Sequence, residues 1–161
     1  MADALDFTEK QTILVVDDTP ENLQLVHGLL KDDYRVKVAN RGEAALKIAA
    51  TLTVPDLILL DIMMPVMEGY EVCKKLKADP VTAEIPVIFL TAKVEIEDEE
   101  QGFAVGAVDY ITKPISPPIL KARVRTHLML KGARDYLKEQ NIYLEQELDR
   151  RLRSRAQKPD N

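Results

Sequence analysis

Five residues whose side chains could bind a metal or take part in catalysis each follow a short apolar run. They are Asp17, Asp18, Asp61, Thr91 and Lys113. Carboxylates can hold a divalent cation, and a carboxylate can also act as a nucleophile that forms an acyl phosphate. A hydroxyl and an ammonium group can bind the phosphoryl oxygens in such a transfer. The residue types therefore indicate metal-assisted phosphoryl chemistry, provided that the fold brings them together.

The apolar runs alternate with amphipathic stretches of helical period. Strands are predicted at 13–16, 34–38, 57–60, 87–90 and 107–111. Helices are predicted at 21–31, 43–51, 70–77 and 95–105. The first, third and fourth runs are apolar on both faces, as in parallel strands covered by helices on both sides. The alternation predicts an α/β fold over residues 11–120, with a doubly wound five-stranded parallel sheet.

In such a sheet, function lies beyond the carboxyl ends of the strands, where the five residues would converge. Carboxylates this close repel one another, so the metal-free cluster should be destabilised or partly protonated. All-oxygen ligation favours Mg²⁺, whereas zinc would favour His or Cys. Asp61 is the best candidate nucleophile because it ends the middle strand, and Asp17 and Asp18 are candidate metal ligands. Taken singly, each Asp would be read as a helix N-cap, but four strand ends with complementary chemistry make that reading a poor one.

Four motifs carry a family resemblance, namely ILVVDDTPEN, LILLDIMMPVMEGYEVCKKLK, VIFLTA and GAVDYITKPI. Together they resemble the receiver domain of two-component response regulators, which has a flavodoxin-like fold. The resemblance implies that Asp61 accepts a phosphoryl group from a sensor histidine kinase or a phosphotransfer protein. It implies that Thr91 hydrogen-bonds this group and that Lys113 pairs with it. It also implies that Tyr110 is a switch aromatic, which swings inward as Thr91 follows the phosphoryl group.

The same resemblance implies how Mg²⁺ is bound. Asp18, Asp61 and the backbone carbonyl of Met63 would be ligands, and Asp17 would act through water. Met63 and Lys93 stand at positions that tune hydrolysis of the phosphoryl group in this family, so its lifetime is left open.

The end of the chain follows another pattern. We expect an extended linker helix at 121–153, followed by a disordered tail at 154–161, and a flexible N-terminus at 1–10. Apolar residues recur every seven positions at Leu130, Leu137 and Leu144, and the intervening positions of this seam are His127, Arg134, Asn141 and Leu148. The seam predicts a homodimeric coiled coil, although a leucine face that packs locally is the alternative.

Composition excludes several classes of protein. The net charge is −5, and the Lys and Arg of residues 121–161 outnumber the acids by 11 to 6. These charges are mixed and spaced, so a solvated helix is favoured over direct nucleic-acid binding. A single cysteine, the lack of a signal-peptide pattern and the lack of a long apolar run predict a cytoplasmic protein without a membrane segment.

Three alternatives remain for function. The chain could be a stand-alone phosphorelay receiver, or the front piece of a longer regulator. Its linker resembles those that precede cyclic-di-GMP phosphodiesterase or diguanylate cyclase outputs, with the phosphodiesterase type preferred. A phosphohydrolase with Asp17 as nucleophile is disfavoured, because that chemistry uses two acids spaced two apart and a cap over the site. Apart from its own phosphorylation and dephosphorylation, we expect no enzymatic activity from this chain.

Overall fold

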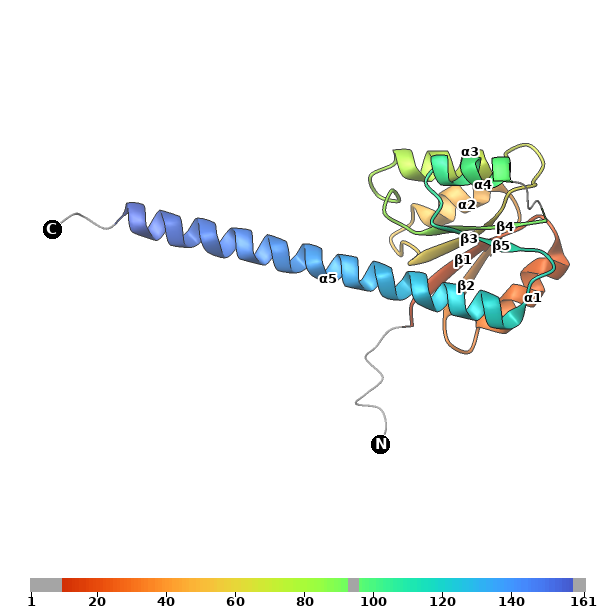
Figure 1. Ribbon diagram of the computed structural model, residues 1–161, viewed down its shortest axis with the longest axis horizontal. Helices are drawn as coiled ribbons and strands as arrows, with labels where there is room; N and C mark the ends of the chain where they lie inside the picture. Colours follow the sequence, from red (N-terminus) through yellow and green to blue (C-terminus); the bar gives the residue numbers. More distant parts are fainter. Residues whose placement is uncertain (1–9, 93–95, 158–161) are drawn as a thin grey trace, which may run out of the picture. The chain divides into compact units, whose positions relative to one another are not determined.

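The computed structural model describes residues 10–92 and 96–157 and contains one parallel sheet (Figure 1). Its strands are β1 (Thr12–Val16), β2 (Arg35–Ala39), β3 (Leu57–Asp61), β4 (Val87–Thr91) and β5 (Asp109–Thr112). The strand order is β2-β1-β3-β4-β5, and all four neighbouring pairs are parallel. The predicted doubly wound five-stranded sheet is thus confirmed, and β3 lies at its centre.

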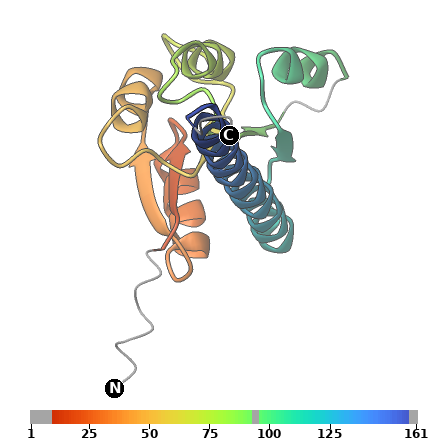
Figure 2. The same ribbon diagram turned by 90° about the vertical axis from the view of Figure 1, so that its left-hand side faces the viewer.

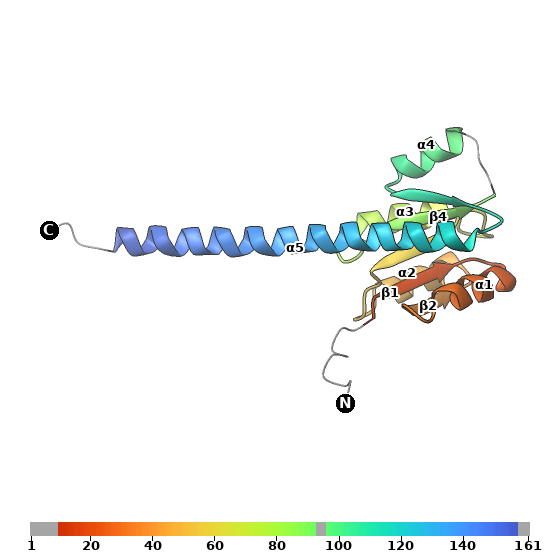
Figure 3. The same ribbon diagram turned by 60° about the horizontal axis from the view of Figure 1, so that its bottom comes forward.

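Helices cover both faces of this sheet (Figures 1 and 2). They are α1 (Pro20–Leu30), α2 (Gly42–Ala49), α3 (Gly69–Ala78), α4 (Ile96–Ala104) and α5 (Pro117–Ala156). Helices α2 and α3 pack on one face, and α1 and the first part of α5 pack on the other. Helix α4 lies over the β5 edge of the sheet (Figures 2 and 3). No helix of the described residues is long and apolar enough to span a membrane.

Two apolar cores result, because successive strand side chains point to opposite faces. On the α2–α3 face, Leu14, Leu60 and Phe89 are fully buried. On the α1–α5 face, Ile13 and Leu59 are fully buried as well. A strand that is apolar at every position contributes alternate side chains to both cores. This double burial explains why the continuous apolar runs of the sequence mark the central strands.

The element bounds differ from the predicted ones by a few residues, most clearly at β5. The strand begins at Asp109, two residues later than predicted, because the chain first closes a turn after α4. Gly106 has a φ of +103°, and the N–H of Ala107 donates to the carbonyl of Gly102 at 3.1 Å. Glycine is the residue that adopts this left-handed backbone without steric cost.

The last helix differs from its predicted bounds at both ends. It begins at Pro117, and Leu120, Val124 and Leu128 are buried, so the compact unit extends to Leu128 and past the predicted boundary at 120. It continues to Ala156, so residues 154–156 are helical where a disordered tail was predicted. Within the second unit, Glu147 accepts hydrogen bonds from two arginines three and four residues on, and such pairs support the end of a helix.

Three expectations fall on residues outside the described part of the chain. These are the flexible N-terminus at 1–9, the role of Lys93, and the tail at 158–161.

Candidate functional site

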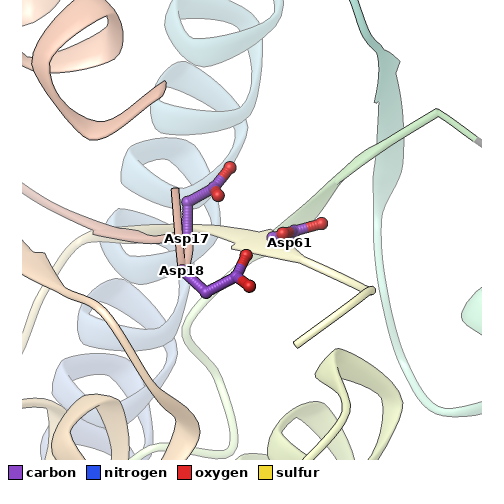
Figure 4. Close-up of side chains that lie close together, drawn as sticks. All are labelled: Asp17, Asp18 and Asp61. Carbon is purple, nitrogen blue, oxygen red and sulfur yellow. The ribbon is translucent and has the colours of Figure 1, made fainter. Parts of the chain in front are cut away.

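Three carboxylates meet at the carboxyl edge of the sheet, as the sequence predicted (Figure 4). Asp17 and Asp18 follow β1, and Asp61 ends the neighbouring strand β3. One oxygen from each of the three lies within 4.8 Å of the others. Asp17 and Asp61 are buried and Asp18 is exposed, so the cluster opens to solvent on the Asp18 side.

Lys113 is the counter-charge of this cluster. Its Nζ lies 2.8 Å from Asp17 Oδ2 and 3.4 Å from Asp61 Oδ1. The other oxygen of Asp17 accepts a hydrogen bond from the N–H of Thr19 at 2.9 Å. The buried Asp17 is therefore satisfied on both oxygens, and its carboxylate is held in one orientation.

Asp61 has an unusual proton affinity. Burial raises its pKa, as does the neighbouring charge of Asp17, and Lys113 and the N–H of Met63 oppose the rise. The net result is a pKa of about 6, well above the ordinary 3.8. The predicted partial protonation of the metal-free cluster agrees with this value. A cation in the cluster would remove the repulsion that contributes to it.

The loop after β3 orients the Asp61 carboxylate and contains a turn that the sequence alone did not predict. The N–H of Met63 donates to Asp61 Oδ1 at 3.2 Å. Further along, the N–H of Met67 donates to the carbonyl of Pro65 at 2.8 Å, around Val66 with a φ of +70°. This three-residue turn is rare and strained for a β-branched residue. The sequence does not indicate this turn, because valine is not one of the residue types that are common in turns.

Gly69 explains how α3, the helix after this loop, comes so close to β3. A Cβ on Gly69 would overlap the Asp61 carbonyl and lie 2.8 Å from the Cα of Ile62. The Gly69 N–H donates to the carbonyl of Ile62 at 2.9 Å. A glycine is thus required because backbone meets backbone here.

Thr91 and Tyr110, the predicted switch residues, lie on the next two strands. Thr91 ends β4 and is buried, and Leu90 beside it is in register with Asp61. Tyr110 on β5 is in register with Phe89, and its side chain points inward with 9% of the residue exposed. The two ring centroids are 5.6 Å apart. The structure therefore holds the ring in the inward position.

A polar cluster beside Tyr110 was missed by the sequence analysis. Arg123 donates two hydrogen bonds to Asp109, at 2.8 and 2.9 Å, and His127 Nε2 lies 2.9 Å from Asp109 Oδ2. Burial raises the pKa of Asp109, but hydrogen bonds from His127, the Tyr110 N–H and Arg123 outweigh it and the net pKa is lowered. His127 was assigned to the coiled-coil seam, and this is corrected. Its side chain packs on the β5 end of the compact unit, a contact that helical spacing could not reveal.

The donor set fits a hard divalent cation. Three carboxylate oxygens lie within reach of a single ion, with one side open to water. Such a set suits Mg²⁺, which keeps several waters and takes few protein ligands. Asp17, Asp18 and Asp61 are the side chains that would hold it.

Comparison with known proteins gives the family. The model of the response regulator receiver domain matches residues 13–125. The chain belongs to this family. Among solved structures, the receiver resembles the chemotaxis protein CheY4 of Vibrio cholerae with a TM-score of 0.69 and 32% identity, over 73% of this chain and 98% of that one. The predicted family and fold are both confirmed.

Two curated relatives are much longer than the receiver. A probable cyclic di-GMP phosphodiesterase of Vibrio cholerae is 53% identical over 87% of this chain and 32% of its own length. The response regulator PleD of Caulobacter vibrioides is 46% identical over 79% of this chain and 28% of its own length. The chain thus spans about a third of the length of the curated relatives that it matches.

Proposed function

We propose that Asp61 accepts a phosphoryl group from a phosphohistidine of a sensor kinase or phosphotransfer protein, and that the receiver thereby switches a downstream output. The observation that carries this proposal is the buried Asp61, held between a second buried carboxylate and Lys113 at the end of the central strand. Family membership supports the same role.

In the proposed transfer, an oxygen of the Asp61 carboxylate attacks the phosphorus atom of the donor. The new P–O bond forms as the P–N bond to the imidazole breaks, and the imidazole nitrogen leaves with the electron pair. In this proposal, Lys113 and Thr91 donate hydrogen bonds to the phosphoryl oxygens. Mg²⁺, when bound by Asp17, Asp18, Asp61 and the Met63 carbonyl, supplies positive charge that offsets the charge of the phosphoryl group.

A small-molecule donor tests the proposal without a kinase. The receiver is incubated with acetyl phosphate and Mg²⁺, and intact mass spectrometry measures the added phosphoryl group. We expect uptake by the wild type and by the exposed-site control Asp32→Asn, and none by Asp61→Asn or in chelator. Uptake that survives Asp61→Asn would contradict the proposal. Steady hydrolysis of the donor by Asp61→Asn through Asp17 would instead favour the phosphohydrolase alternative.

We further propose that residues 129–156 of α5 pair with a second copy of the chain as a short coiled coil. Leu130, Leu137 and Leu144 recur every seven residues and are each 60% exposed, and Leu148 extends the stripe at 58%. Burial of this stripe against its copy removes apolar surface from water. Sedimentation of the wild type and of Leu137→Glu, each with and without a phosphoryl mimic, tests this. An assembly state that is the same in all four samples would contradict both pairing and its control by phosphorylation.

We propose that, as the front piece of a longer regulator, the receiver controls a cyclic di-GMP output, with a phosphodiesterase favoured over a diguanylate cyclase. The support is the relative from Vibrio cholerae, a probable cyclic di-GMP phosphodiesterase whose similarity to this chain extends over 140 residues. Translation of the reading frame beyond Asn161 tests this proposal. A phosphodiesterase sequence there supports it, and a DNA-binding or absent output contradicts it.

A further inference from the structure

Helix α4 contains a glycine whose missing side chain leaves room for the switch tyrosine. A Cβ built on Gly102 would overlap the hydroxyl oxygen of Tyr110 and lie 2.5 Å from its Cζ. It would also lie 3.1 Å from a ring carbon of Phe89. Real Cβ atoms do not approach other atoms so closely, so an alanine at 102 and the inward ring of Tyr110 compete for the same space.

The Tyr110 ring has aromatic neighbours on two sides. The Tyr110 ring packs at 5.6 Å from Phe89 and at 5.4 Å, edge to face, from Phe103 of α4. Phe89 in turn packs edge to face against Tyr70 of α3 at 5.3 Å. Four rings thus form a continuous row from α3 through β4 and β5 to α4. A side chain at 102 would therefore have to displace the Tyr110 ring from this row, or displace α4.

Two other helical glycines, Gly28 and Gly132, do not share this crowding. A Cβ on Gly28 in α1 or on Gly132 in α5 would meet nothing within 4 Å. An alanine in a helix is normally more stable than a glycine. At Gly28 alanine should therefore be neutral or stabilising, whereas at Gly102 the overlap with Tyr110, and to a lesser degree the close contact with Phe89, opposes the same change.

We propose that Gly102 is a positioning residue for the switch, which allows Tyr110 to lie inward beneath α4. A side chain at 102 drives the ring outward, or drives α4 away from β5. In either case the face formed by α4 and β5 changes without any change at Asp61. The link to phosphorylation rests on the proposed function and on the switch role that the family resemblance implies for Tyr110, in which the ring lies inward in the phosphorylated state.

The position of the ring can be measured without phosphorylation. The chain has five tyrosines, so ring-labelled protein gives few NMR signals, and Tyr110→Phe assigns the one of interest. A soluble paramagnetic probe broadens signals of exposed rings. We expect Tyr110 to be shielded in the wild type and in Gly28→Ala, and broadened in Gly102→Ala, with the other four signals unchanged. A Tyr110 signal that stays shielded, with unchanged shift, in Gly102→Ala would overturn the proposal.

If Gly102→Ala does not fold, a second variant keeps the proposal testable. Replacing Tyr110 by Leu removes the ring that the new Cβ would meet. Recovery of the folded state in Gly102→Ala/Tyr110→Leu, measured by circular dichroism, would support the proposal. A double variant that fails to fold, although Tyr110→Leu alone folds, would overturn it, because the Tyr110 ring would then not be what excludes a side chain at 102.

A second readout separates this inference from the proposed function. Beryllofluoride with Mg²⁺ serves as the phosphoryl mimic, and its affinity is titrated by NMR. If the inward ring is coupled to phosphoryl binding, Gly102→Ala should weaken binding by at least about fivefold, whereas Gly28→Ala should not change it. Equal affinities would overturn the coupling. If the wild type binds no mimic, the proposed function fails, and the shielding of Tyr110 still decides the role of Gly102.

Discussion

Lys113 Nζ lies 2.8 Å from Asp17 Oδ2. This ion pair connects the residue after β5 to the residue after β1, across the two strands that lie between them, β3 and β4. Asp17 is fully buried, and the Lys113 side chain is 19% exposed. The ion pair therefore ties both sides of the site to the carboxyl edge of the sheet. It also places the ammonium group within 3.4 Å of Asp61 before any phosphoryl group arrives.

Removal of this ammonium group should destabilise the metal-free protein. Lys113→Met leaves the buried Asp17 carboxylate without its counter-charge, and such a loss costs about 3 kcal/mol of unfolding free energy. We expect added Mg²⁺ to recover part of this loss, since a cation can take over the charge compensation. Urea denaturation with and without Mg²⁺ measures both effects. Lys75→Met, at an exposed ion pair, is the matched control and should change the stability little. A Lys113→Met variant as stable as that control would contradict the assigned role.

Because the pKa of Asp61 is raised, this residue should make the free energy of unfolding depend on pH. The folded state holds this proton up to about pH 6, whereas an ordinary carboxyl loses it near 3.8. Asp61 therefore reduces stability as pH rises from about 4 to about 6, and the reduction is complete above that range. Without divalent cations, Asp61→Asn should be more stable than the wild type near neutral pH, by about 2 kcal/mol. The difference should vanish near about pH 4. A stability difference between Asp61→Asn and the wild type that is constant with pH would show that another effect of the substitution causes it.

Gly69 should tolerate no side chain. Gly69→Ala pushes the start of α3 away from Ile62 and the Asp61 carbonyl, because both contacts are backbone. Overpacking of this kind costs about 1–3 kcal/mol. The displaced loop should also slow phosphorylation by acetyl phosphate. Thermal unfolding and the rate of uptake are measured beside Gly28→Ala, whose Cβ meets open space. Wild-type stability and uptake in Gly69→Ala would refute the close-approach argument.

Much of the site was predictable because each of its residues follows a strand. In a parallel sheet the carboxyl ends meet at one edge, so the apolar runs alone place Asp17, Asp61 and Thr91 together. The contacts that could not be predicted join residues without a periodic relationship. His127 reaches Asp109 over eighteen positions through the packing of α5 on β5, and helical spacing alone had assigned it elsewhere. Likewise, the approach of Gly102 to Tyr110 depends on how α4 lies on the sheet edge.

The cluster around Asp109 should show the opposite pH dependence to Asp61. Because its pKa is lowered, Asp109 stabilises the fold above the ordinary carboxyl pKa, and this contribution is lost as pH falls through the lowered value. Asp109→Asn should therefore be less stable than the wild type near neutral pH, by about 1 kcal/mol. The gap should close below about pH 4. Denaturation at several pH values measures it, with Asp32→Asn as the exposed control. A gap that widens on acidification would contradict the assignment.

The central claim is that the phosphoryl group resides on Asp61, and chemical trapping tests it most directly. The receiver is phosphorylated with acetyl phosphate and Mg²⁺, the acyl phosphate is reduced with borohydride, and peptide mass spectrometry locates the resulting homoserine. The account predicts homoserine at position 61 and none at 17 or 18. Homoserine at position 17 or 18 in place of 61 would contradict it.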